Sequence, residues 1–140
     1  VAGLVAITPG AGFVGPMSAL VIGAVGGVLC SIACSLKPKF GYDDSLDVVG
    51  VHGVGGTWGA LATGLFASKA INAAGNDGLF FGNPGQLWIQ FITVVVTIIF
   101  AMVATAIILS ILKAIMGLRV SDEEERMGLD LTQHNERAYE

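Results

Sequence analysis

The chain has 140 residues, of which 54% are hydrophobic and only 13% are charged, and its formal net charge is −4. Val1–Leu36 and Gly78–Leu112 contain no charged residue, and His52 is the one ionisable side chain within Val48–Ser68. A soluble domain carries about 25% charged residues, and uncharged stretches longer than the ~20 residues that cross a bilayer are typical of membrane proteins. The composition therefore excludes an ordinary soluble fold and predicts an all-α, polytopic membrane helix bundle.

The first segment, Val1–Thr8, is expected to be the end of a helix, because Pro9 and the glycines that follow it favour a break or a turn. The segment has no basic region and no initiating Met, which argues against a signal peptide. We therefore expect the chain to begin inside a longer protein.

Three full membrane spans are expected, at about residues 15–36, 46–67 and 86–116. Lys37-Pro38-Lys39 is expected to end the first, and Asp47 to cap the second at the cytoplasmic mouth through its first amides. The third would be roughly 45 Å long at 1.5 Å per residue, so it should tilt or project. Residues 1–116 are thus predicted to be a membrane domain, and residues 117–140 a polar tail.

The distribution of lysine and arginine predicts the orientation. Lys37 and Lys39 lie in the loop after the first span, and Lys113, Arg119, Arg126 and Arg137 lie at the end of the third span and in the tail. Two crossings separate these segments, so all six basic residues lie on one side of the membrane. The opposite side has only Lys69. Since cytoplasmic loops carry the excess of basic residues, the C-terminus is predicted to be cytoplasmic, in a multi-pass protein of the cell membrane.

Small residues recur at every fourth position along two of the spans, which favours close helix packing in lipid. The two ladders are Gly15, Ala19, Gly23, Gly27, Ser31 and Ser35, and Gly56, Ala60, Gly64 and Ser68. Cys30 and Cys34 are interpreted as small packing residues. Phe13, Trp58 and Trp88 are interpreted as packing or interfacial residues.

His52 is the candidate functional residue. It lies about 7.5 Å along the helix from Asp47, and we expect it to be buried within the membrane, where ionisable residues mark pathways or relays by default. A neutral imidazole both donates and accepts a hydrogen bond, which suits the passage of a small polar solute along an apolar path. The alternative is a structural histidine bonded to a neighbouring helix. Physical reasoning alone does not name the solute.

Other site classes find no support in the sequence. There is no nucleotide-binding loop, metal cluster, nucleophile with a base, or basic patch for nucleic acid, so neither an enzyme nor a cofactor is expected.

Three motifs in the chain resemble the ammonium transporter family (Amt/Mep/Rh), in order and over nearly its whole length. They are Leu4-Val-Ala-Ile-Thr8-Pro9-Gly-Ala-Gly12, Asp47-Val-Val-Gly-Val-His52-Gly-Val, and Gly117-Leu-Arg119-Val with Glu123-Glu-Glu, Gly128-Leu-Asp130, His134 and Ala138-Tyr139. The resemblance implies the end of the eighth helix and helices nine to eleven of an eleven-helix fold, assembled as a homotrimer with one pore per subunit.

The same resemblance implies site residues. His52 matches the second of two pore histidines that share a hydrogen bond, and the first, like the outer recruitment site, lies outside this chain. Val48, Thr8 and Val1 match pore-lining positions. The implied substrate is ammonium, deprotonated so that ammonia crosses an apolar lumen.

The tail resembles a regulatory C-terminus that contacts a neighbouring subunit and helps receive a PII-type signal protein. The residues that match are Arg119, Glu123, Glu124, Gly128, Asp130, Thr132, His134 and Tyr139. Thr132 matches a threonine that is phosphorylated in plant relatives. Asn135 departs from the usual His-Gly-Glu of the family. A solvated, disordered tail is the alternative.

Two further functions stay open. An ammonium sensor would use the same scaffold, so the sequence does not separate sensing from transport. An Rh-like gas channel is disfavoured by the acidic tail motif.

Overall fold

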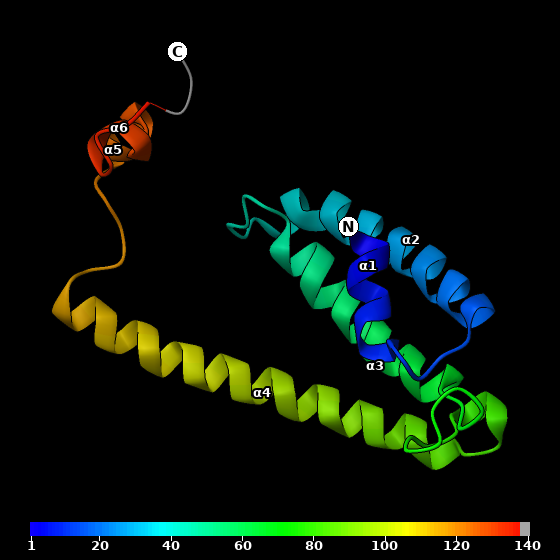
Figure 1. Cartoon of the computed structure of the whole chain (residues 1–140). Coiled ribbons are helices and arrows are strands. Elements are labelled where there is room, and N and C mark those ends of the chain that lie inside the picture. Colours follow the sequence, from blue (N-terminus) through cyan, green and yellow to red (C-terminus); the bar gives the residue numbers. More distant parts are fainter. Residues whose placement is uncertain (138–140) are drawn as a thin grey trace. The chain divides into compact units, whose positions relative to one another are not determined.

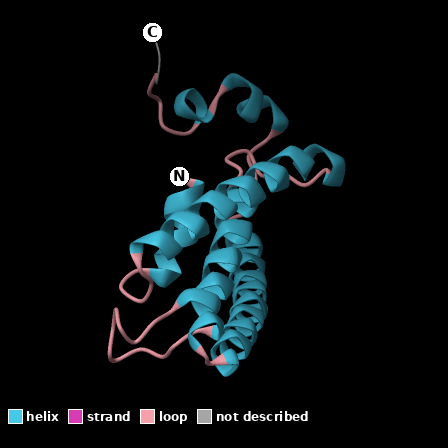
Figure 2. Ribbon diagram, turned by 90° about the vertical axis from the view of Figure 1, so that its right-hand side faces the viewer, coloured by secondary structure: helices cyan, strands magenta, loops and turns pink. Residues whose placement is uncertain are grey.

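The computed structural model describes residues 1–137, and within them every regular element is a helix (Figures 1 and 2). In chain order the elements are α1 (Ala2–Ile7), the 3-10 helix η1 (Thr8–Gly10), α2 (Pro16–Phe40), the π-helical η2 (Val49–Gly53), α3 (Val54–Phe66), the 3-10 helix η3 (Leu79–Phe81), α4 (Pro84–Ile115), α5 (Asp122–Met127) and α6 (Leu129–Thr132). Val1–Ile98 forms one compact unit, and the residues from Ile99 onward form a second.

Helix α2 is longer than the sequence suggested. It begins at Pro16, whose fixed φ suits the first helical position, and it continues through Pro38 to Phe40. A proline so close to the end removes only one backbone hydrogen bond. The helix then closes on Gly41, which adopts φ 65° and donates its N–H to the Lys37 carbonyl. The expected end at residue 36 was therefore wrong.

Helix α1 lies against both α2 and α3 (Figure 1). The buried core of this contact consists of Ala6, Ile22 and Ala62. Trp58 packs beside it and donates its indole N–H to the carbonyl of Ile22 at 3.0 Å, which satisfies the polar atom of an otherwise apolar ring. The interpretation of Trp58 as a packing residue is confirmed.

The close backbone approaches use the two predicted ladders only in part. On α2 the buried residues are Ile22, Gly26 and Cys30, whereas a Cβ added at Gly27 would meet nothing within 4 Å. On α3 the tight contacts are at Gly55, Gly59 and Gly64, of which only Gly64 belongs to the predicted ladder, whereas Gly56 is open. Since both helices carry glycines on adjacent faces, spacing alone could not identify the face that packs.

The two cysteines are packing residues, as expected. Both are free thiols, and Cβ atoms built at Gly55 and Gly50 would stand 2.9 Å from the sulfur of Cys30 and 2.6 Å from that of Cys34. Glycine at these two positions lets η2 and α3 approach α2.

Two helices of the described chain, α2 and α4, are long and apolar enough to cross a membrane. The middle segment, expected at residues 46–67, is one uninterrupted helical stretch in which the π-helical η2 leads directly into the 13-residue α3, so that it starts at Val49 and ends at Phe66.

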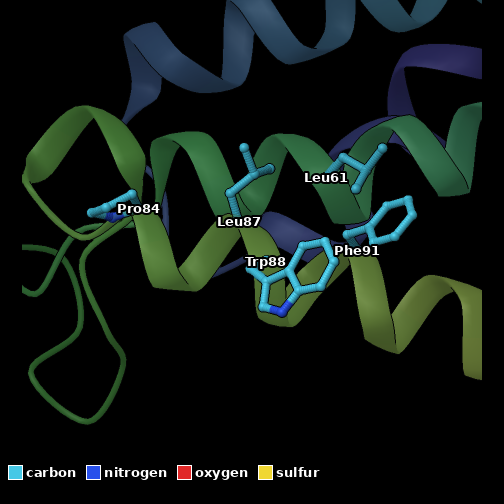
Figure 3. A pocket seen from close by; sticks show the side chains of 5 residues that line it. All are labelled: Leu61, Pro84, Leu87, Trp88 and Phe91. Atoms are coloured by element: carbon cyan, nitrogen blue, oxygen red, sulfur yellow. The ribbon is translucent and has the colours of Figure 1, made fainter.

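Helix α4 begins and ends close to the expected bounds of 86 and 116, and none of its residues is buried. One hollow beside it, of about 510 Å³, lies in the first unit and is lined by apolar side chains. These are Leu61 of α3 and, on or at the start of α4, Pro84, Leu87, Trp88 and Phe91 (Figure 3). The Trp88 and Phe91 rings stack with their centroids 5.4 Å apart. Nothing in this hollow offers polar chemistry.

Candidate functional site

The π-helical turn η2 positions His52. A π turn holds one more residue than an α turn and is frequent at functional sites. The His52 side chain was expected to be buried, but it is exposed in this structure. Residues 1–137 alone therefore do not bury it.

One hollow of about 360 Å³ brings together His52 and the start of the chain. Val1 and Thr8, two of the residues that were matched to pore positions, line it with His52, and Val48 does not. The remaining walls are Leu4, Val5, Pro9 and Gly56, so the surroundings are almost wholly apolar. The hydroxyl of Thr8 donates to the Leu4 carbonyl at 2.7 Å, which leaves the hydroxyl oxygen free to accept from a solute.

A second hollow, of about 270 Å³, lies on the α4 side of the histidine. It is lined by His52 and by three threonines, Thr57, Thr93 and Thr97. Gly56 lines both hollows, and a Cβ at Gly56 would meet nothing within 4 Å. The imidazole therefore borders both hollows, and Gly56, which has no side chain, forms part of the wall of each.

The turn that carries His52 is capped by Asp44 and not, as the sequence suggested, by Asp47. The two carboxylate oxygens of Asp44 accept the N–H groups of Val48 and Val49, each at 2.8 Å. These amides lie at the first turn of η2, where backbone donors lack partners within the helix. Asp44 is the better placed of the two because it precedes the turn by enough residues to fold back over it.

Asp47 has a different role, because its carboxylate pairs with Lys37 at the end of α2. Lys37 also donates to the carbonyl of Asp44 at 2.9 Å. The lysine thus joins the last turn of α2 to the loop that leads into η2. Asp47 itself adopts φ 56°, a left-handed conformation that is uncommon for a residue other than glycine.

The tail contains a well-formed capping box at the start of α5. The Ser121 hydroxyl accepts the N–H of Glu124 at 3.3 Å, and the Glu124 carboxylate accepts the Ser121 backbone N–H at 2.9 Å. Hydrogen bonds from the backbone and then the hydroxyl of Ser121 hold the pKa of Glu124 below its usual range. Arg119 pairs with Glu125 at 3.5 Å, and Glu123 is exposed on α5.

Gly128 and Thr132 connect α5 to α6. Gly128 adopts φ 100°, and a Cβ there would stand 2.6 Å from a carboxylate oxygen of Asp130, so the bend requires glycine. The Thr132 hydroxyl donates to the Gly128 carbonyl at 3.0 Å, and Gln133 donates to the Glu124 carboxylate at 3.2 Å.

The turn after α6 accommodates the unusual asparagine. Asn135 has φ 52°, a conformation that asparagine tolerates better than most residues other than glycine. The backbone N–H of His134 donates to Leu129, and that of Glu136 donates to Asp130. Tyr139, the last predicted tail residue, lies outside the described residues.

Sequence reasoning overlooked two features of this region: the cap by Asp44 and the ion pair between Lys37 and Asp47. Asp44 was visible in the run Asp43-Asp44-Ser45-Leu46-Asp47, where any of three carboxylates could have served as the cap. Within residues 1–137 there is no group of three or more His, Cys, Asp or Glu side chains able to hold a metal ion.

Comparison with known proteins agrees with the motifs. The model of the Ammonium Transporter Family matches residues 1–139. The chain is 51% identical over 141 residues to an ammonium transporter of Bacillus subtilis, covering 100% of this chain and 35% of that protein. It is 53% identical over 140 residues to one of Aquifex aeolicus, covering 99% of this chain and 32% of that protein.

Solved structures show the same similarity. The Mep2 structure from Saccharomyces cerevisiae superposes with a TM-score of 0.80 at 37% identity, covering 87% of this chain and 29% of that one. Mep2 from Candida albicans gives 0.78 at 33% identity, with coverage of 88% and 28%. The chain thus spans about a third of the length of the curated relatives it matches, and those relatives are named as transporters and not as enzymes.

Proposed function

The chain belongs to the Ammonium Transporter Family, and on this premise we propose that the full-length protein moves ammonium or ammonia across the cell membrane along an apolar path past His52. The observation that carries the proposal is the hollow that joins Val1, Thr8 and His52 between apolar walls. Such a lining disfavours a hydrated ion and admits a small neutral molecule that exchanges hydrogen bonds with an imidazole.

His52 is assigned the role of hydrogen-bond partner on the path. Its ring nitrogens offer a donor and an acceptor at once, and ammonia needs both. Val48 is assigned to the same wall one turn earlier, although it does not line the hollow formed here. In the full-length protein a second histidine, from a helix outside this chain, is proposed to pair with His52 and to bury it.

The remaining scaffold follows from the family. We assign α1 to the end of an eighth membrane helix, α2 to the ninth, η2 with α3 to the tenth and α4 to the eleventh, in a homotrimer with one pore per subunit. The excess of Lys and Arg on one side supports a cytoplasmic C-terminus. Helices α2 and α4, whose only charged residues are lysines in their last turns, are the spans that the structure supports most directly.

The tail is proposed to be a regulatory element that contacts the cytoplasmic side of the protein and a PII-type partner. Support comes from the capping box of α5, the obligatory bend at Gly128 and the bonds that join α5 to α6. A solvated random tail would not need these features.

An ammonium sensor is the alternative function, with the same path as the detecting site and the tail as the output. A sensor predicts that signalling persists when uptake is abolished. A transporter predicts that uptake and signalling are lost together.

The decisive experiment replaces His52 in the full-length protein. His52→Ala is expected to abolish or strongly alter methylammonium uptake while leaving membrane assembly intact, and His52→Asn, which keeps one donor and one acceptor, should retain more activity. Ser35→Ala, an exposed site on α2, serves as the matched control. Unchanged rate and selectivity in His52→Ala would overturn the assignment.

A further inference from the structure

The apolar hollow of about 510 Å³ beside the first turns of α4 has no part in the His52 path. None of its lining residues borders either hollow at His52. They are Leu61 of α3 with Pro84, Leu87, Trp88 and Phe91 of α4 (Figure 3). Sites for small molecules usually measure about 300–1,000 Å³, so this volume suits a ligand. Because no charged residue lines the hollow, that ligand must present an apolar portion to it.

Helix α4 has a polar face and an apolar face, and the hollow lies on the apolar face. At about 100° per residue, the polar side chains in the first half of α4 fall within an arc of about 60° and line the hollows on the other side of the helix. These are Gln86, Gln90, Thr93 and Thr97. The α4 residues of the apolar hollow are centred about 140° away. Since polar side chains of membrane helices bond to neighbouring helices, the apolar face is the one left for lipid.

The position of Trp88 along α4 places the hollow at a membrane surface. Helix α4 is able to cross a membrane, and Lys113 in its last turn is its one charged residue. At 1.5 Å per residue, Trp88 and Lys113 are roughly 37 Å apart along the axis, between the ~30 Å of a hydrocarbon core and the ~40–45 Å that includes the headgroups. Tryptophan and lysine are the residues that anchor helices at these boundaries. Phe91 lies about one turn deeper than Trp88, so the hollow extends from headgroup level into the hydrocarbon.

Trp88 has an unused polar group at this level. Its side chain is 62% exposed and stacks on Phe91, but among residues 1–137 no group accepts its indole N–H. Trp58, by contrast, donates its N–H to Ile22. In Figure 3 the ring nitrogen of Trp88 lies on the edge of the ring turned away from Leu61. A ligand that suits both features is apolar along its length and has a hydrogen-bond acceptor at one end.

We propose that this hollow binds one acyl chain of a glycerophospholipid, whose ester carbonyl accepts the indole N–H of Trp88. The chain lies between Leu61 and Phe91, and the glycerol and headgroup stay at the membrane surface. With no charged residue in the lining, the site recognises the chain and its ester and not the headgroup. The proposal does not depend on the transport of ammonium past His52.

The test counts the lipids that the full-length protein binds. Protein purified in detergent is titrated with dioleoyl phosphatidylcholine or dioleoyl phosphatidylglycerol, and bound lipids per subunit are counted by native mass spectrometry. Leu61→Trp fills the hollow and should remove one bound lipid. Val96→Trp is the matched control, because it adds the same ring at an exposed position of α4 outside the hollow, and it should remove none.

Trp88→Phe tests the hydrogen bond with little change of shape. It should weaken lipid binding by about 2- to 12-fold, which corresponds to the about 0.5–1.5 kcal/mol of one hydrogen bond. Both phospholipids should be affected alike. A density map of the unsubstituted protein in nanodiscs of dioleoyl phosphatidylcholine should show a chain between Leu61 and Phe91, with a lipid oxygen within hydrogen-bond distance of Trp88 Nε1. This map decides the question if Leu61→Trp folds poorly.

Three results would overturn the proposal. The first is a hollow occupied by a helix or side chain from the remainder of the protein or from a neighbouring subunit. The second is equal lipid binding by Leu61→Trp and Val96→Trp. The third is a Trp88→Phe effect confined to one headgroup, which would move the contact from the ester to the headgroup. Since uptake is not measured, failure here is distinguishable from failure of the His52 path.

Discussion

Gly59 on α3 lies directly against the backbone of Ala6 on α1, so that a Cβ at Gly59 would overlap the Ala6 carbonyl group. Both partners are main-chain atoms, which cannot rotate away as the end of a long side chain can. The contact sets the spacing between the short first helix and the helix that follows His52, and it therefore fixes the width of the hollow that both helices line.

The first prediction follows from that contact. Gly59→Ala should destabilise the full-length protein by about 1–3 kcal/mol, the usual effect of overpacking. Gly27→Ala is the matched control, because a Cβ at Gly27 meets nothing within 4 Å. Denaturant unfolding in detergent measures both. Equal stability of the two variants would show that α1 and α3 are spaced differently in the full-length protein.

A second prediction separates the two aspartates near η2. Asp44→Ala should destabilise the protein by about 1 kcal/mol, as loss of a helix cap does, and should lower methylammonium uptake, because the freed amides begin the turn that carries His52. Asp47→Gly, which removes the carboxylate and suits the φ of 56°, should cost about 0–1 kcal/mol, as expected for a partly exposed ion pair. A larger loss of stability in Asp47→Gly than in Asp44→Ala would restore Asp47 as the cap.

The third prediction concerns Lys37. A double-mutant cycle with Lys37→Met and Asp47→Asn should give a coupling free energy of about 0.2–1 kcal/mol that decreases as salt is added. Lys37→Met alone should cost more than the coupling, since it also removes the donor to the Asp44 carbonyl. Unfolding in low and high salt provides the measurement, and a salt-independent coupling would contradict it.

A fourth prediction is the pH dependence of α5. The folded pKa of Glu124 is depressed, so its contribution to stability is fully present above the unfolded value of 4.5 and is lost as the pH falls through the folded value. Amide exchange, corrected for its intrinsic pH dependence, should therefore show α5 protected near pH 6 and less protected well below pH 4.5. Ser121→Ala should remove most of this difference; protection that does not change with pH would refute the role of the cap.

The last prediction tests the tail as a whole. Deleting residues 121–140 should impair transport or its regulation without preventing insertion into the membrane. Uptake and binding of a PII-type protein are the measurements, with Ser121→Ala as the milder comparison. Normal behaviour in both assays would leave the tail as a solvated extension.

The sequence predicted the helical class and the approximate place of each long helix, because long uncharged stretches can be recognised from the sequence alone. It did not predict which glycines pack, because Gly26 and Gly27, like Gly55 and Gly56, lie side by side and only the bundle selects between them. The sequence analysis assigned the helix cap to Asp47, because any aspartate just before a helix has a high propensity to cap it. In the structure the backbone at Asp47 is left-handed, and its carboxylate pairs with Lys37. Under the proposed function, the remaining walls of the site would come from segments of the full-length protein outside this chain.

Because η2 is a π-helical turn, the number of residues in it determines the direction in which the His52 side chain points. Each residue of an α-helix rotates the chain by about 100° around the helix axis. A π-helical turn contains one residue more than an α-helical turn. Removing Gly53 would leave an ordinary helix with α3 still packed on α1 and α2, but it would turn His52 by about 100° around the helix axis relative to α3. In this segment, then, a deletion that preserves every functional residue would be more disruptive than many substitutions.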